Sequence, residues 1–284
     1  MRTAALLLML AVPCAVAAQA PPNKLEADLA KAKADYDRDP SSPDNAIWLG
    51  RRLGYLGRFS EAIDIFTQGI LKHPGDARLY RHRGHRYITT RRFDLATEDL
   101  KKASQLIAGK ADEVEPDGAP NKAGIPRSTL QSNIWYHLGL AQYLSGDFAS
   151  AVASYREGMK VSRVNDDMLV ATSDWLYMTL RRLKRDAEAR QVLEPIREQM
   201  DVIENGAYHA RLLMYKGLRT PESVLNLNTA DDIQIATQGY GVGHWYLVNG
   251  DRAKARSMFD RVLAGKATTA FGFIAAEVDV KRGF

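Results

Sequence analysis

Large apolar residues recur along this chain at spacings of three, four and seven, which places them on one face of a helix. Two stretches with this pattern lie 34 residues apart and align position by position. The aligned pairs are Gly50/Gly84, Phe59/Phe93, Ala62/Ala96 and Phe66/Leu100. A fixed period of this length predicts two helices per unit. Because one hairpin cannot bury its apolar face alone, we expect several units to stack into a solenoid.

The same pattern returns later in the chain. A third unit carries Trp135, Leu138-Gly139, Ala151 and Tyr155, and the last one carries Gly243, Ala255 and Phe259. The small residues are expected where the two helices of a unit cross, because a larger side chain there would push the backbones apart. Two weaker units lie between, with alanine positions at residues 189 and 223.

The third unit resembles the tetratricopeptide repeat, whose pattern is W-x2-L-G-x2-Y, then A-x3-F, then Pro. Trp135-x2-Leu138-Gly139 matches it, Tyr143 comes one place late, and Ala151-x3-Tyr155 follows. The resemblance covers roughly residues 45–263. It implies an all-α fold, a right-handed α-solenoid of about six helix-turn-helix units with capping helices.

The chain divides into segments around these units. We expect a signal peptide over residues 1–20, and a capping helix (24–38) and linker within 21–44. Two repeats follow over 45–108, and the later repeats occupy 128–263. Between them, residues 109–127 form an acidic loop rich in Pro and Gly. Residues 264–284 hold a C-terminal capping helix, at 268–282.

The first twenty residues have the pattern of a secretory leader: Arg2, then an apolar run, then small residues. Cleavage is expected near Ala17 to Ala20, which predicts a periplasmic or secreted protein. Pro13 before Cys14 argues against a lipoprotein. If the leader is removed, Cys14 goes with it, and thiol chemistry is then excluded. No second long apolar run occurs, so we expect no membrane span in the mature protein.

Hydrophobic residues make up 45% of the chain and charged residues 26%, as in ordinary folded proteins. The net charge of +5 is too small to indicate a nucleic-acid partner by itself. The six histidines form no H-E-x-x-H motif, and Gly239-x-Gly241-x-Gly243 lacks the last glycine of a nucleotide-binding loop. We therefore expect no metal, no cofactor and no enzyme, although a catalytic site assembled in space would leave no sequence motif.

Charge is concentrated in the segment 78–92, where Arg78, Arg81 and His85 share one helical face. The face is either simply solvated or a binding surface. The acidic loop 109–127 has two interpretations as well. It is a solvated surface loop, or it has a functional role in which it folds over this basic helix or rims the binding groove.

The resemblance implies a concave groove lined by the first helix of each unit, where such proteins bind peptides. The candidate groove residues are Arg51, Arg78, Arg81, His85, Tyr136, Tyr143, Asp174, Tyr208, Tyr215, Tyr240 and His244. They lack the Lys and Asn set of the family's carboxylate clamp. Arginine pairs well with carboxylates, which favours an acidic partner segment.

Three functions follow from these observations. The favoured one is a non-enzymatic scaffold or adaptor that binds a partner protein or peptide. The alternatives are a binding module for an acidic small molecule or envelope glycan, and a subunit of an envelope enzyme complex. The sequence predicts neither the partner nor the oligomeric state.

Overall fold

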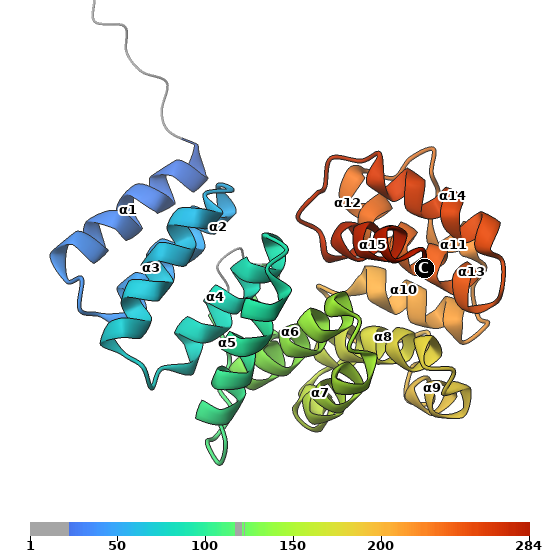
Figure 1. The fold of residues 1–284 in the computed structure, drawn as a ribbon, viewed down its shortest axis with the longest axis horizontal. Coiled ribbons are helices and arrows are strands. Elements are labelled where there is room, and N and C mark those ends of the chain that lie inside the picture. Colours follow the sequence, from blue (N-terminus) through green and yellow to red (C-terminus); the bar gives the residue numbers. More distant parts are fainter. Residues whose placement is uncertain (1–22, 117–120, 122) are drawn as a thin grey trace, which may run out of the picture.

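The computed structural model describes residues 23–116, 121 and 123–284. The predicted leader, with Cys14, lies outside the described residues. The described chain is built almost entirely from helices, which follow one another along a curved array from the N-terminal to the C-terminal end (Figure 1). Within the described residues, no helix is both long and apolar enough to cross a bilayer.

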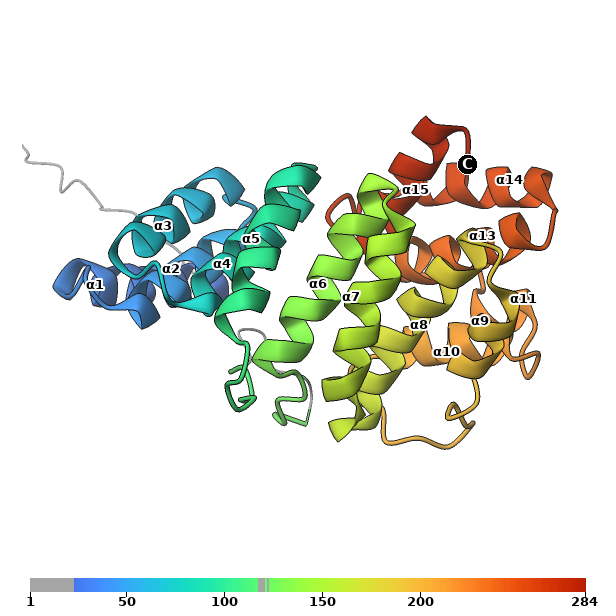
Figure 2. The same cartoon turned by 60° about the horizontal axis from the view of Figure 1, so that its bottom comes forward.

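The helices are α1 (Lys24–Arg38), α2 (Pro43–Tyr55), α3 (Phe59–Lys72), α4 (Ala77–Thr89), α5 (Phe93–Leu106), α6 (Leu130–Ser145), α7 (Phe148–Val161), α8 (Asp166–Arg182), α9 (Asp186–Val192), α10 (Gly206–Tyr215), α11 (Pro221–Val224), α12 (Asp232–Gln234), α13 (Tyr240–Val248), α14 (Arg252–Leu263) and α15 (Phe271–Arg282). A π-helical segment, Ile235–Gly239, joins α12 to α13. Consecutive helices pair as α2–α3, α4–α5, α6–α7, α8–α9, α10–α11 and α13–α14. In the first three pairs, the second helix also packs on the first helix of the next pair (Figure 2). This is the predicted α-solenoid of about six units.

The helix crossings confirm the role expected of the small residues. A Cβ added to Gly139 would lie 2.6 Å from Tyr155 Cε1, and one added to Gly243 would lie 2.6 Å from Phe259 Cε1. Gly50 and Gly84 have the same relation to Phe66 and Leu100, each sixteen residues on. The alanines at the crossings, Ala62, Ala96, Ala151 and Ala255, are all 0% exposed.

The fifth unit departs from the prediction. Its second helix, α11, is a single turn, and Leu225 already has extended backbone. Ser223 was expected at the buried alanine position but is exposed, and Leu227 is 40% exposed. The neighbouring Val224 and Leu225 are buried instead, at 6% each. The expected burial of Ser223 is therefore wrong: α11 is a single turn, and the residue that it buries is Val224.

Helix α1 has the predicted bounds and begins with a capping box between Asn23 and Glu26. The C-terminal helix begins three residues later than predicted. Its apolar face is nevertheless the predicted one, with Ile274 and Ala275 at 0% exposure and Val278 at 8%. The segment between α5 and α6 is irregular where it is described, and an antiparallel bridge between Val114 and Thr129 closes it.

Candidate functional site

The predicted groove residues fall into three groups in the structure. Arg51 on α2 and Arg78, Arg81 and His85 on α4 belong to the first two units. Tyr136 and Tyr208, both half-buried, join hydroxyls at 3.2 Å between α6 and α10. The other predicted positions are buried: Tyr143, Asp174, Tyr215, Tyr240 and His244.

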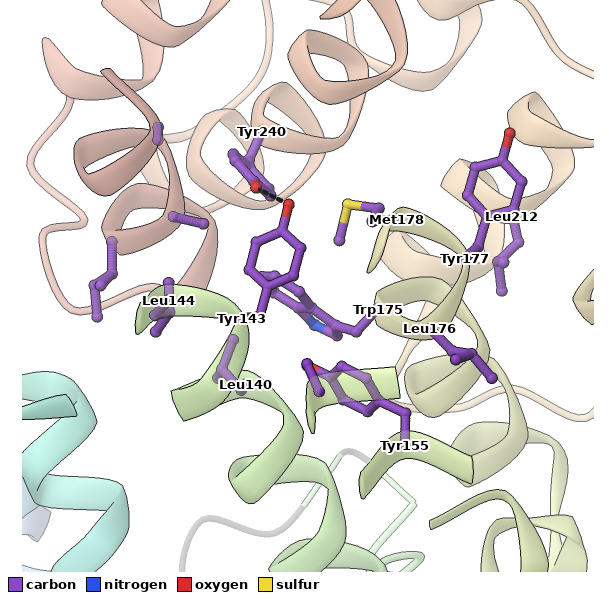
Figure 3. Close-up of a cluster of buried hydrophobic side chains, with 14 of the residues drawn as sticks. Leu140, Tyr143, Leu144, Tyr155, Trp175, Leu176, Tyr177, Met178, Leu212 and Tyr240 are labelled. Carbon is purple, nitrogen blue, oxygen red and sulfur yellow. Dashed lines mark hydrogen bonds between the residues drawn. The ribbon is translucent and has the colours of Figure 1, made fainter. Parts of the chain in front are cut away.

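The buried group forms the interior of the C-terminal half. Tyr143 and Tyr240 share a hydrogen bond of 2.6 Å between their hydroxyls (Figure 3), and Tyr240 also donates to Asp279 on α15 at 2.9 Å. Trp175 packs edge-on against Tyr143 and stacks on Tyr240. Since α13 and α15 cover this face of α6 and α8, these tyrosines stabilise the core and are closed to a partner in this conformation.

Asp174 is paired inside the same core. Its Oδ2 lies 2.7 Å from Arg211 Nη2, and both side chains are 0% exposed. Burial raises the pKa of Asp174 to about 7, although the Arg211 charge opposes this rise. Asp174 is therefore the counter-charge of the buried Arg211.

The acidic loop contacts α4, in agreement with the expectation that it folds over the basic helix. Glu115 is 8% exposed and lies 3.2 Å from Arg81 Nε. His82 Nδ1 accepts from Arg81 at 2.9 Å, which leaves His82 Nε2–H facing Glu115 at 3.4 Å. Asn133 on α6 donates to the same carboxylate at 2.8 Å. Burial lowers the pKa of His82 well below its usual value, so this histidine is neutral.

Three arginines gather beside this contact: Arg51 on α2, and Arg81 and Arg86 on α4. We call them the basic face. Arg51 lies over the Trp48 ring at 4.7 Å and Arg86 near the Phe59 ring at 5.7 Å, and no described carboxylate lies within ion-pairing distance of either. Burial and the charges of Arg81 and Arg51 lower the pKa of Arg86 to about 10. The basic face thus holds three cations against one described carboxylate, Glu115.

Arg78 differs from these three arginines because two carboxylates neutralise its charge. It lies 2.7 Å from Asp44 and 2.6 Å from Asp76, and these contacts raise its pKa. The His85 ring is tilted against the rings of His137 and Phe271, with ring centroids 4.6 and 5.4 Å away. Burial lowers the pKa of His85 well below normal, so it adds no charge.

The groove residues predicted from the family pattern do not include Arg86, which belongs to the basic face, or Trp48, which lies under Arg51. Arg86 belongs to the arginine-rich segment 78–92, but it lies one residue beyond His85, the position taken from the family pattern. Trp48, three residues before Arg51 on α2, is likewise not among the positions taken from the family pattern. Both would have been found by considering the neighbouring helical positions as well. Among the described residues, no group of three or more candidate metal ligands occurs.

Comparison with known proteins supports the repeat assignment. Residues 132–165 match the family model of the tetratricopeptide repeat. A search of curated proteins gave no match. A similar solved chain comes from the APC/C hetero-tetramer Cut9–Hcn1, with 15% identity, a TM-score of 0.52, and coverage of 90% of this chain and 39% of that one. At this identity the likeness shows the fold alone.

Two smaller solved structures are also similar. One is YrrB, a TPR protein with an unusual peptide-binding site, at 13% identity and TM-score 0.46, covering 87% of this chain and 97% of that one. The other is PilF of Pseudomonas aeruginosa, at 16% identity and TM-score 0.49, covering 86% and 87%. Stacked helical repeats of this kind commonly serve as protein-interaction scaffolds. Residues 132–165 are therefore assigned as a tetratricopeptide repeat, which is set in an array of similar helical hairpins.

Proposed function

We propose that this protein is an exported, non-enzymatic scaffold whose basic face binds an acidic segment of a partner protein. One observation carries the proposal: Arg51, Arg81 and Arg86 lie together on adjacent first helices, and Glu115 is the one described carboxylate that pairs with them. The proposal that the protein is exported is based on the leader pattern of residues 1–20. It is tested by measuring the mass of the protein isolated from its host, which should lack these residues.

Charge provides the physical reason. Half-buried guanidiniums repel one another, and burial weakens their hydration. A partner carboxylate would relieve this repulsion and form charge-assisted hydrogen bonds, which contribute about 1.5–3 kcal/mol each. Arg51 is best placed to meet it, because the two groups that its guanidinium directly contacts, the Trp48 ring and the Tyr55 hydroxyl, are uncharged.

The test compares two peptides on three proteins. A flexible Gly/Ser peptide with spaced glutamates is titrated into the wild type, and the same peptide with glutamines serves as the neutral probe. We expect the glutamate peptide to bind more tightly, and more weakly as salt rises. Arg51→Gln should lower its affinity about tenfold. Lys102→Gln, an exposed change of the same charge on α5, should leave it unaltered.

Two outcomes would overturn the proposal: equal binding of the glutamate and glutamine peptides, or equal losses in the Arg51 and Lys102 variants. The same proteins then serve as baits in the native extract. A partner that the wild type and Lys102→Gln retain, and Arg51→Gln loses, would be assigned to the basic face.

A further inference from the structure

A small cavity of about 230 Å³ adjoins the basic face between α2, the start of α4 and the acidic loop. Arg51 belongs to its lining, so the cavity and the basic face form one continuous surface. The apolar part of its wall comes from Ile47, Trp48, Val114, Pro116 and Leu130.

The volume indicates what the cavity can hold. A protein cavity of roughly 150 Å³ is enough to enclose benzene. Clefts for drug-sized ligands are larger, about 300–1,000 Å³. At this size the cavity fits one large side chain and is too small for most organic ligands, which favours a side chain delivered by a partner.

The loop wall is held in place by its own contacts. Glu115 N donates to Ser128 O at 2.9 Å, and Leu130 N donates to Glu113 O at 2.9 Å. The buried ion pair of Glu115 with Arg81 fixes the loop on α4. Val114 nevertheless stays 57% exposed, although its neighbours on the loop are tied down. A rigid wall that presents an apolar side chain to water is suited to receiving an apolar group.

Charges at the rim are unevenly placed. Asp44 and Arg51 lie seven residues apart on α2, which is about 10 Å along the helix. Asp44 and Glu113 belong to the lining together with Arg78, which Asp44 neutralises. Glu115, which also lines the cavity, is paired with Arg81. The cation of the lining without a described acidic partner is therefore Arg51. A bound segment would be oriented with its own carboxylate toward Arg51 and away from Asp44 and Glu113.

We infer that this cavity is an anchor site for one large apolar side chain, such as Phe, in a partner segment that has a carboxylate beside it. The carboxylate pairs with Arg51 and the apolar side chain fills the space between Trp48 and Val114. This inference rests on the proposed function, since the acidic residue is the one bound by the basic face.

The test uses four Gly/Ser host peptides that differ at two adjacent positions: Asp-Phe, Asp-Ala, Asn-Phe and Lys-Phe. Binding is followed by chemical-shift changes of the labelled full chain. We expect Asp-Phe to bind best, with losses of at least about tenfold for both Asp-Ala and Asn-Phe. Lys-Phe should bind worst. If Asp-Phe binds no more tightly than about 1 mM, or no more tightly than Asp-Ala, the anchor site is wrong.

Two matched variants separate the anchor from the charge. Val114→Trp should fill the cavity and abolish the advantage of Phe over Ala, whereas Val164→Trp changes another exposed valine, 65% exposed and remote in sequence, and should preserve it. If Arg51→Gln weakens binding while Val114→Trp and Phe→Ala do nothing, the anchor fails and the proposed function stands. If Asp→Asn and Arg51→Gln do nothing, the proposed function fails as well.

Discussion

Arg211 and Asp174 carry opposite charges inside a packed helical interior, where neither side chain reaches water. Arg211 also donates to Thr237 O at 3.1 Å and lies against the Tyr208 ring at 5.2 Å. Transferring two charges from water into a core is costly, and their mutual attraction offsets that cost only while both are present. We therefore expect the pair to add little net stability, whereas loss of either charge alone should destabilise the fold.

A double-mutant cycle tests this view. Asp174→Leu alone should lower the free energy of unfolding by about 3–5 kcal/mol, because Arg211 is left buried and unpaired. Arg211→Met alone should cost less, since Asp174 already has a raised pKa and can take up a proton. The double variant should recover most of the loss in urea unfolding. Additive losses would show that the two charges do not depend on each other.

The acidic loop is the element that distinguishes this array from evenly spaced repeats. Glu115 connects it to α4 and α6 through Arg81 and Asn133. The same carboxylate is the described counter-charge of the basic face. One residue thus has two roles, since it stabilises the loop and limits how strongly the arginines attract an acidic partner.

Glu115→Gln separates these roles because it retains a polar side chain of the same size. We expect the free energy of unfolding to fall by about 1–3 kcal/mol, since Arg81 loses its buried counter-ion. Affinity for the glutamate peptide should rise, because the basic face then holds a greater positive charge. Glu98→Gln is the control, an exposed change of the same charge on α5 for which no ion pair to described residues is present. Weaker peptide binding by Glu115→Gln would contradict this account.

At the scale of the helices, much of the fold could be predicted from the sequence. Periodic spacing located the hairpins, because a glycine at each crossing must face a large residue sixteen positions on, as Gly139 faces Tyr155. The fifth unit escaped prediction because spacing alone does not show that a helix stops after one turn. Leu227 fits the repeat pattern but lies beyond the end of α11.

The candidate site was harder to predict than the fold. Helical periodicity identifies which residues face the concave side, but it does not show whether that side stays open. Tyr143 and Tyr240 occupy groove positions, yet they are joined to each other and covered from the C-terminal end. That closure depends on contacts between residues far apart in the sequence, which no local pattern contains.

In the whole molecule, contacts between residues far apart in the sequence join the C-terminal segment to earlier repeats. Arg91 Nε lies 3.0 Å from Glu277 on α15, and its Nη2 donates to Thr268 O at 2.8 Å. Phe271 inserts its ring beside His85 and His137, at 5.4 and 5.7 Å. The C-terminal helix therefore packs on the second and third repeats as well as on its own neighbours. None of these contacts involves Arg51, Arg81 or Arg86, the residues of the basic face.

The histidines at this closure should make the fold sensitive to acid. Burial lowers the pKa of His137 from 6.5 to about 3, and it lowers that of His85 as well. Between pH 6.5 and 3 the unfolded chain binds a proton at residue 137 that the folded chain does not. Stability must therefore fall as pH falls below 6.5, by about 1.4 kcal/mol per pH unit for each such histidine.

Urea unfolding at pH 7.5, 6.5 and 5.5 measures this slope. His137→Asn removes one titrating group, so its stability should fall less steeply below pH 6.5 than that of the wild type. The difference between the two slopes isolates His137 from other groups, including Asp174, whose raised pKa acts in the opposite direction. Parallel profiles would mean that His137 is already protonated in the folded chain. The closure of the C-terminal helix over His85 and His137 would then tolerate a buried charge, which its aromatic surroundings make costly.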